Sequence, residues 1–146
     1  MTDYLVDTNV ISELVRPSPD ANVVTWVRAA DESQLFLSVL SFGEIRRGIE
    51  QIPPGPRRER LRRWLEIDLT DRFDGRVLGI DRRVAEIWGI IMTRGAAASI
   101  RLPILDTLIA ATAEHHGMVI VTRNTRDFAY AAVACLNPWQ AQDSSG

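Results

Sequence analysis

The stretch Met118-Val119-Ile120-Val121 decides the fold, because it is the strongest strand signal in the chain. All of its side chains are apolar, which is typical of an interior parallel strand that is covered on both faces. A helix is predicted directly before it, from Asp106 to about His116, and Gly117 is a natural stop for that helix. A helix that leads into a fully apolar strand indicates an α/β fold.

The same alternation of helices and short apolar strands extends outward through the rest of the chain. Strands are expected at 4–6, 35–37, 77–80, 118–121 and near 134–136. Helices are expected just past 7–9, from the cap Ser18 onward, from 39 to about 51 after the cap Ser38, beyond the proline-rich break at 53–56, after the cap Asp81, and at 106–116. The pattern predicts a three-layer α/β/α sandwich with a mainly parallel sheet of four or five short strands.

Length and composition indicate one globular domain. The chain has 146 residues, of which 46% are hydrophobic and 25% are charged, and it contains no linker long enough to divide it. We expect a single domain over 1–139 and a flexible tail at 140–146.

Cysteine usage and the first residues bear on the cellular compartment. Cys135 is the only cysteine, so no intramolecular disulfide can form, and we expect it to be a small buried hydrophobe. Acidic residues bracket the first apolar side chains, unlike in a signal peptide, and no apolar run approaches the length of a membrane span. We therefore expect a cytoplasmic protein that does not contact membranes.

The basic residues are unevenly distributed. The net charge is −2, yet all 17 basic residues are arginines, and five of them lie between Arg57 and Arg63. Such a run could steer a polyanion, because guanidinium groups match phosphate oxygens. It could equally be the solvated face of a helix. Both interpretations of this segment stay open.

Four acidic residues are expected near one edge of the sheet. Asp7 ends the first strand, Asp127 follows the strand at 118–121, Asp106 opens a helix, and Glu44 lies on the helix after the second strand. In open parallel sheets, ligands bind at the carboxyl ends of the strands. Carboxylates brought together there repel one another and need a proton or a cation. Hard divalent ions such as Mg²⁺ and Mn²⁺ prefer oxygen ligands of this kind.

Each acid also has a purely structural explanation. Asp7 and Asp106 could cap helices, Asp127 could stabilise a turn, and Glu44 could be a surface residue. A zinc site does not compete, because the adjacent pair His115-His116 cannot face one metal. Polar residues beside the acids could orient carboxylates or water: Thr8, Asn9, Thr122 and Asn124.

Four segments together resemble a known family. Leu5-Val6-Asp7-Thr8-Asn9-Val10-Ile11-Ser12, Ser41-Phe42-Gly43-Glu44-Ile45, Leu105-Asp106-Thr107-Leu108-Ile109-Ala110-Ala111-Thr112-Ala113 and Val121-Thr122-Arg123-Asn124-Thr125-Arg126-Asp127-Phe128 resemble the PIN-domain nucleases, and more narrowly the VapC and FitB toxins. The motifs occur in family order, and together they span nearly the whole chain.

The resemblance assigns roles to the acids. It implies an acidic pocket at the carboxyl edge of a parallel sheet, in which Asp7, Glu44, Asp106 and Asp127 are the catalytic and metal-binding residues. Asp7 and Asp106 would bind Mg²⁺ or Mn²⁺ directly, whereas Glu44 and Asp127 would act through water or help to position the nucleophile. Thr122 and Asn124 match polar positions beside the pocket. The arginine-rich segment falls where the family varies.

The resemblance also implies a function and partners. The expected activity is metal-dependent cleavage of RNA by the toxin of a type II toxin–antitoxin system. The expected assembly is a homodimer bound by a small antitoxin, which inserts a segment into the pocket. DNA would be contacted only through the antitoxin.

Two other functions remain as alternatives. The chain could be a binding module of the same fold that acts with the antitoxin at an operator and has little turnover. It could also be a Mg²⁺-dependent phosphatase or phosphotransferase with Asp7 as nucleophile. The second alternative is weakened because Asn9 stands where haloacid-dehalogenase-like enzymes usually have another aspartate, and because the chain has no lysine.

Overall fold

Five short parallel strands form the centre of the molecule. The computed structural model describes residues 1–142. The strands are β1 (Tyr4–Val6), β2 (Leu35–Ser38), β3 (Val77–Leu78), β4 (Val119–Val121) and β5 (Cys135–Leu136), in the order β3-β2-β1-β4-β5. Every pairing is parallel, so the carboxyl ends of all the strands lie at the same edge. The predicted mainly parallel sheet is confirmed.

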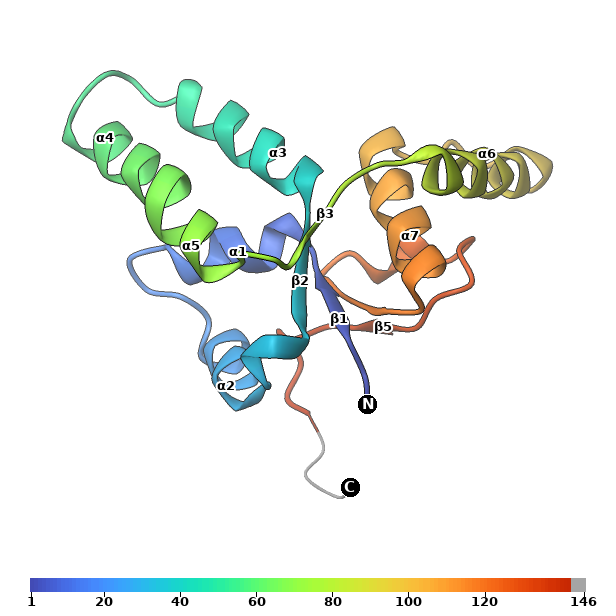
Figure 1. Cartoon of the computed structure of the whole chain (residues 1–146), viewed down its shortest axis with the longest axis horizontal. Coiled ribbons are helices and arrows are strands. Elements are labelled where there is room, and N and C mark those ends of the chain that lie inside the picture. Colours follow the sequence, from blue (N-terminus) through green and yellow to red (C-terminus); the bar gives the residue numbers. More distant parts are fainter. Residues whose placement is uncertain (143–146) are drawn as a thin grey trace.

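Helices cover both faces of this sheet (Figure 1). One side carries α1 (Thr8–Leu14), α2 (Ala21–Ala29), α3 (Val39–Glu50), α4 (Pro56–Arg63) and its continuations, the π-helix η2 (Trp64–Leu69) and α5 (Thr70–Arg72). The other side carries α6 (Arg82–Ala97) and α7 (Ile104–His116). Two short 3₁₀ turns, η1 (Glu32–Gln34) and η3 (Thr125–Phe128), complete the fold. The predicted three-layer sandwich is therefore present.

The central strands divide the interior into two hydrophobic cores. In β1, Leu5 packs into the core beneath α6 and α7, whereas Val6 packs into the core beneath α1 to α5. In β4, Ile120 packs into the first of these cores and Val121 into the second. This alternation follows from the strand geometry, because successive side chains point to opposite faces. All four of these side chains are at most 2% exposed.

Three predicted helix boundaries agree with the structure. The Ser38 hydroxyl accepts a hydrogen bond from the backbone N of Leu40 at 3.1 Å and caps α3. The Asp81 carboxylate accepts one from the backbone N of Val84 at 2.9 Å and caps α6. Gly117 ends α7 with a φ of 66°, a left-handed conformation that glycine adopts without steric cost.

Four details of the prediction are wrong. Asp20, not Ser18, caps α2, because its carboxylate accepts hydrogen bonds from two backbone amides of the first turn. The third strand ends at Leu78 instead of 80, since its partner β2 ends at Ser38. α7 begins at Ile104, so Asp106 lies within its first turn. Cys135 is only half-buried, because β5 is an edge strand.

Two further expectations concern the tail at 140–146 and membrane-spanning segments. Residues 143–146 of the predicted tail lie outside the described residues, while the Gln142 side chain donates a hydrogen bond to the Asn137 carbonyl at 3.0 Å. Within 1–142, no helix is both long and apolar enough to span a bilayer.

Gly95, near the end of α6, lies close to the loop that contains Leu102, and this contact can be tested. A Cβ added at Gly95 would lie 2.6 Å from Leu102 Cδ1 and 3.3 Å from the carbonyl oxygen of Ile100. Leu102 is buried, so it has little room to move, and overpacking typically costs about 1–3 kcal/mol. We expect Gly95→Ala to lower the free energy of unfolding by about 1–2 kcal/mol in urea denaturation.

Gly89 on the same helix supplies the matched control. Nothing lies within 4 Å of a Cβ added there, and alanine favours a helix by about 1 kcal/mol over glycine. Gly89→Ala should therefore leave the protein as stable as before or make it more stable. If the two variants had equal stability, the close packing of α6 against the Leu102 loop would be disproved.

Candidate functional site

Asp7 is the most tightly held of the four predicted acids. It follows β1 directly, and its backbone N donates to the Val121 carbonyl at 2.9 Å, which continues the pairing with β4. Its Oδ1 accepts a hydrogen bond from the Thr8 backbone N at 2.8 Å, and its Oδ2 accepts one from the Thr122 hydroxyl at 2.8 Å. The residue is only 4% exposed. Asp7 is thus both the cap of α1 and a fixed carboxylate at the centre of the sheet edge.

Thr122, which follows β4, is bonded to residues at the start of α1 and to the turn before η3. Besides donating to Asp7, its hydroxyl accepts hydrogen bonds from Asn9 Nδ2 at 3.3 Å and from the backbone N of Asn124 at 3.0 Å. Asn9 Nδ2 also lies 3.4 Å from Asp7 Oδ2. The positions predicted at Asn9 and Thr122 therefore support Asp7 with their side chains. Asn124 contributes through its backbone, because its amide is the group that bonds to Thr122.

Glu44 reaches the same edge from α3. Its Oε1 accepts a hydrogen bond from the Thr8 hydroxyl at 2.8 Å, and that hydroxyl is also 2.8 Å from Ser41 Oγ. A threonine hydroxyl has one proton to donate, and a carboxylate is the stronger acceptor. Thr8 therefore connects the start of α1 to Glu44, which is the role predicted for a polar neighbour.

Ser41 is the member of this site that the sequence reasoning missed. It is fully buried and contacts Thr8 rather than one of the acids. A signal was available, because Ser41 precedes Glu44 by three residues and the two share a face of α3. What the sequence does not show is that Thr8, on a different helix, lies where its hydroxyl can bond to both residues.

Asp106 and Asp127 complete the group from α7 and η3. The pKa of Asp106 is raised to about 7, first by burial and then by the negative charges of Asp7, Asp127 and Glu44. A hydrogen bond with Asp127 adds to the same rise. Burial also raises the pKa of Asp7, and the charges of Glu44 and Asp127 contribute, although hydrogen bonds from Thr122 and Thr8 oppose the change. The structure therefore brings all four predicted acids into mutual electrostatic contact.

The charge balance at the four carboxylates depends on the basic side chains near them. Within residues 1–142, none of them forms an ion pair with an arginine. Over that same range, no three His, Cys, Asp or Glu side chains are placed so that together they could hold a metal ion. The donor set nevertheless consists of carboxylate oxygens alone, which fits a hard divalent cation and would relieve the repulsion that raises the pKa of Asp106.

Comparison with known proteins identifies the fold and its relatives. The sequence pattern of the PIN domain matches residues 4–134. The chain is 36% identical to toxin FitB of Neisseria gonorrhoeae, over 92% of this chain and 97% of FitB. It is 35% identical to the VapC ribonuclease Y4jK of Sinorhizobium fredii, over 93% of this chain and 97% of that protein.

A solved structure extends the similarity to three dimensions. The structure of FitAB bound to an IR36 DNA fragment superposes with a TM-score of 0.91 at 35% identity, covering 97% of this chain and 99% of the matched chain. The chain described above therefore belongs to the PIN-domain family.

Proposed function

We propose that this protein is a Mg²⁺- or Mn²⁺-dependent endoribonuclease and the toxin of a type II toxin–antitoxin system. The observation that carries the proposal is the meeting of Asp7, Glu44, Asp106 and Asp127 at one sheet edge without an arginine partner. The similarity to proteins named VapC ribonuclease and toxin FitB supports the same reaction class.

The individual acids would have different tasks. Asp7 and Asp106 would hold the cation directly, because Asp7 is fixed by hydrogen bonds and Asp106 has a pKa raised to about 7 by burial and by neighbouring negative charges. A bound divalent ion supplies charge stabilisation and water activation in phosphodiester hydrolysis. Glu44, held by Thr8, and Asp127 would orient the attacking water and accept its proton.

The supporting residues explain why the carboxylates need little rearrangement. Thr122 holds Asp7 Oδ2, and the backbone amide of Thr8 holds Oδ1, so the Asp7 side chain has one orientation. Catalytic groups must be held to within a fraction of an ångström, and such neighbours supply that precision.

We also propose the partners that go with this function. The substrate would be RNA, and a small antitoxin would bind beside the acidic pocket of a homodimer in the cytoplasm. The support is the likeness to FitAB, whose solved structure contains DNA. DNA would be reached by the complex through the antitoxin, because the chain itself carries a net charge of −2.

The first prediction concerns cleavage. Asp7→Asn should reduce metal-dependent cleavage of single-stranded RNA by more than about 100-fold, since changes even to outer partners of a metal site cost about 10- to 100-fold. EDTA should abolish wild-type cleavage, and Mg²⁺ or Mn²⁺ should restore it. The control is Asp74→Asn, which removes a negative charge from an exposed position. Equal rates for wild type, Asp7→Asn and the EDTA sample would contradict the mechanism.

The second prediction concerns pH. An acid with a pKa raised by folding destabilises the protein once it ionises, so the penalty at Asp106 is small near the unfolded pKa of 3.8 and complete above about 7. In metal-free protein, Asp106→Asn should be more stable than wild type by about 1–2 kcal/mol at about pH 8 and by less at about pH 5, allowing for solvent screening of a half-buried group. Thermal melting measures both differences.

The same melts test the cation. Millimolar Mg²⁺ should raise the melting temperature of the wild type, and it should raise that of Asp106→Asn by less, because ligand binding stabilises only the form that binds. Asp74→Asn should respond as the wild type does. A wild type whose stability gains nothing from either Mg²⁺ or Mn²⁺ would rule out the metal site.

The third prediction separates a toxin from a binding module with little turnover. Expression of the chain alone in a bacterial host should arrest growth, and Asp7→Asn should remove the arrest while leaving binding of the antitoxin intact. Growth curves with and without a co-expressed cognate antitoxin measure the effect. Tight antitoxin binding without arrest by the wild type would favour the module.

A further inference from the structure

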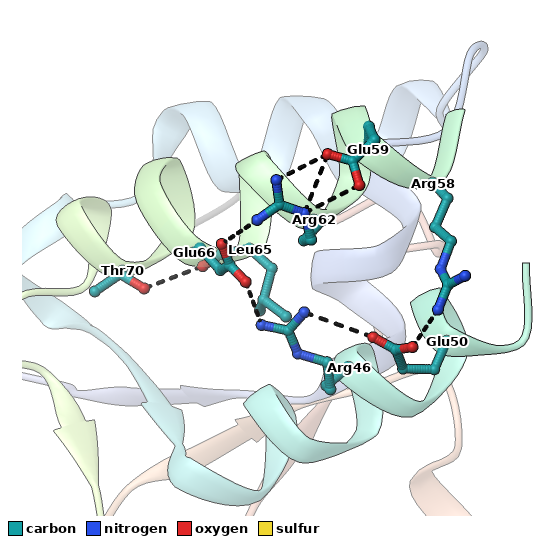
Figure 2. Close-up of polar contacts among 8 residues, drawn as sticks. All are labelled: Arg46, Glu50, Arg58, Glu59, Arg62, Leu65, Glu66 and Thr70. Carbon is teal, nitrogen blue, oxygen red and sulfur yellow. Dashed lines mark hydrogen bonds and ion pairs between the residues drawn. The ribbon is translucent and has the colours of Figure 1, made fainter. Parts of the chain in front are cut away.

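The arginines of α4 divide into two groups with different surroundings. Arg58 and Arg62 belong to a network of ion pairs that joins α4 to α3 and to the π-helix (Figure 2). Arg62 contacts Glu59 at 2.8 Å and Glu66 at 2.7 Å, while Arg58 is paired with Glu50. The charge on these two side chains is already balanced by glutamates.

Arg57 and Arg60 have no such partners. Within residues 1–142 neither forms an ion pair, and both are exposed. They are three residues apart, and Trp64 lies four residues beyond Arg60, so all three occupy one face of the helix. Two unbalanced guanidinium groups and an indole are thus presented together.

That face lines a groove whose wall also includes Glu44, one of the four acids of the proposed active site. The groove has a volume of about 780 Å³ and runs between α1, α3 and α4. Glu44 lies at one part of its wall, while Arg57, Arg60 and Trp64 lie at another. Arg16 also lines it, but Glu13 lies 3.3 Å from that guanidinium. The groove therefore includes Glu44, one of the four acids, and is positively charged along α4.

We propose that this groove holds the single-stranded RNA next to the scissile phosphodiester, with Arg57 and Arg60 binding backbone phosphates and Trp64 offering a surface for a base. The inference rests on the proposed function, since it assigns a path to that substrate. Arginine forks bind phosphate in a bidentate manner, and residues one helical turn apart can hold consecutive phosphates. Arginines beside an aromatic face are a common arrangement for single-stranded nucleic acid.

The charge pattern favours this occupant. An RNA strand at the carboxylates would meet four negative side chains, so cations nearby are needed to hold its flanking phosphates. Arg57 and Arg60 are suited to this because no glutamate has to be displaced first. The groove also has aliphatic residues, including Ile45 and Ile49, which an amphipathic peptide would bury instead. That occupant is therefore one of the outcomes of the test.

The experiment compares two double variants of the full chain. Arg57→Gln with Arg60→Gln removes the two groove arginines of α4, whereas Arg58→Gln with Arg62→Gln removes the two arginines of α4 that pair with glutamates. Both change the net charge equally and come from the same helix. Thermal melts confirm folding, which the lost surface ion pairs should affect little.

Two measurements distinguish positioning from a structural effect. In the groove variant, the KM for cleavage of a short single-stranded RNA should rise about 10- to 100-fold, with kcat changed by less than about threefold. In an Asp7→Asn background that does not cleave, binding of the same RNA should weaken, and the slope of log affinity against log salt should fall by about 1.4, or 0.7 for each lost phosphate contact. The paired-arginine control should keep the wild-type KM and slope.

Four results would overturn the inference. If both double variants lose RNA affinity equally, only overall charge matters. If the groove variant keeps its RNA affinity but loses affinity for the antitoxin, the groove holds a peptide. If the wild type neither binds nor cleaves RNA, the proposed function fails and the inference falls with it, whereas normal cleavage by both double variants would reject the inference alone.

Discussion

The burial of the Asp7 carboxylate at the end of the central strand is the constraint on which the rest of the site depends. A buried carboxylate is costly unless hydrogen bonds satisfy its oxygens. Here the Thr8 amide and the Thr122 hydroxyl do so, which ties the end of β1 to α1 and to β4. The same parallel pairing that builds the sheet therefore also fixes the orientation of the carboxylate.

The remaining acids reach this point from separate elements. Glu44 comes from α3, Asp106 from the first turn of α7 and Asp127 from η3. Burial, together with the negative charges of the other three acids, raises the pKa of Asp106 to about 7. The fold thus holds four carboxylates near one another although their negative charges repel. Such an arrangement is typical of functional sites rather than of structural ones.

In the layer formed by α3 and α4, different residues serve stability and the proposed binding of RNA. Its position is set by apolar packing, because Ile45 and Ile49 of α3 are buried in the same core as Leu65 and Leu69 of η2, the continuation of α4. Its surface ion pairs contribute little to stability individually. They do, however, neutralise Arg58 and Arg62 and leave Arg57 and Arg60 unpaired along the groove. Within the arginine-rich segment, Arg58 and Arg62 belong to a surface network of ion pairs, and phosphate binding is proposed for Arg57 and Arg60 alone.

The sequence by itself determined the type of fold and the order of its elements, and it predicted the four acids. Short apolar strands such as 118–121, caps such as Ser38 and Asp81, and motifs in family order are local signals that do not depend on distant contacts. The tertiary structure alone decided that Ser41 and Thr8 meet, that Asn124 acts through its backbone, and which arginines are paired. Hydrogen bonds and ion pairs between elements depend on distances of a few ångströms between residues far apart in the chain, and no pattern within one segment encodes those distances.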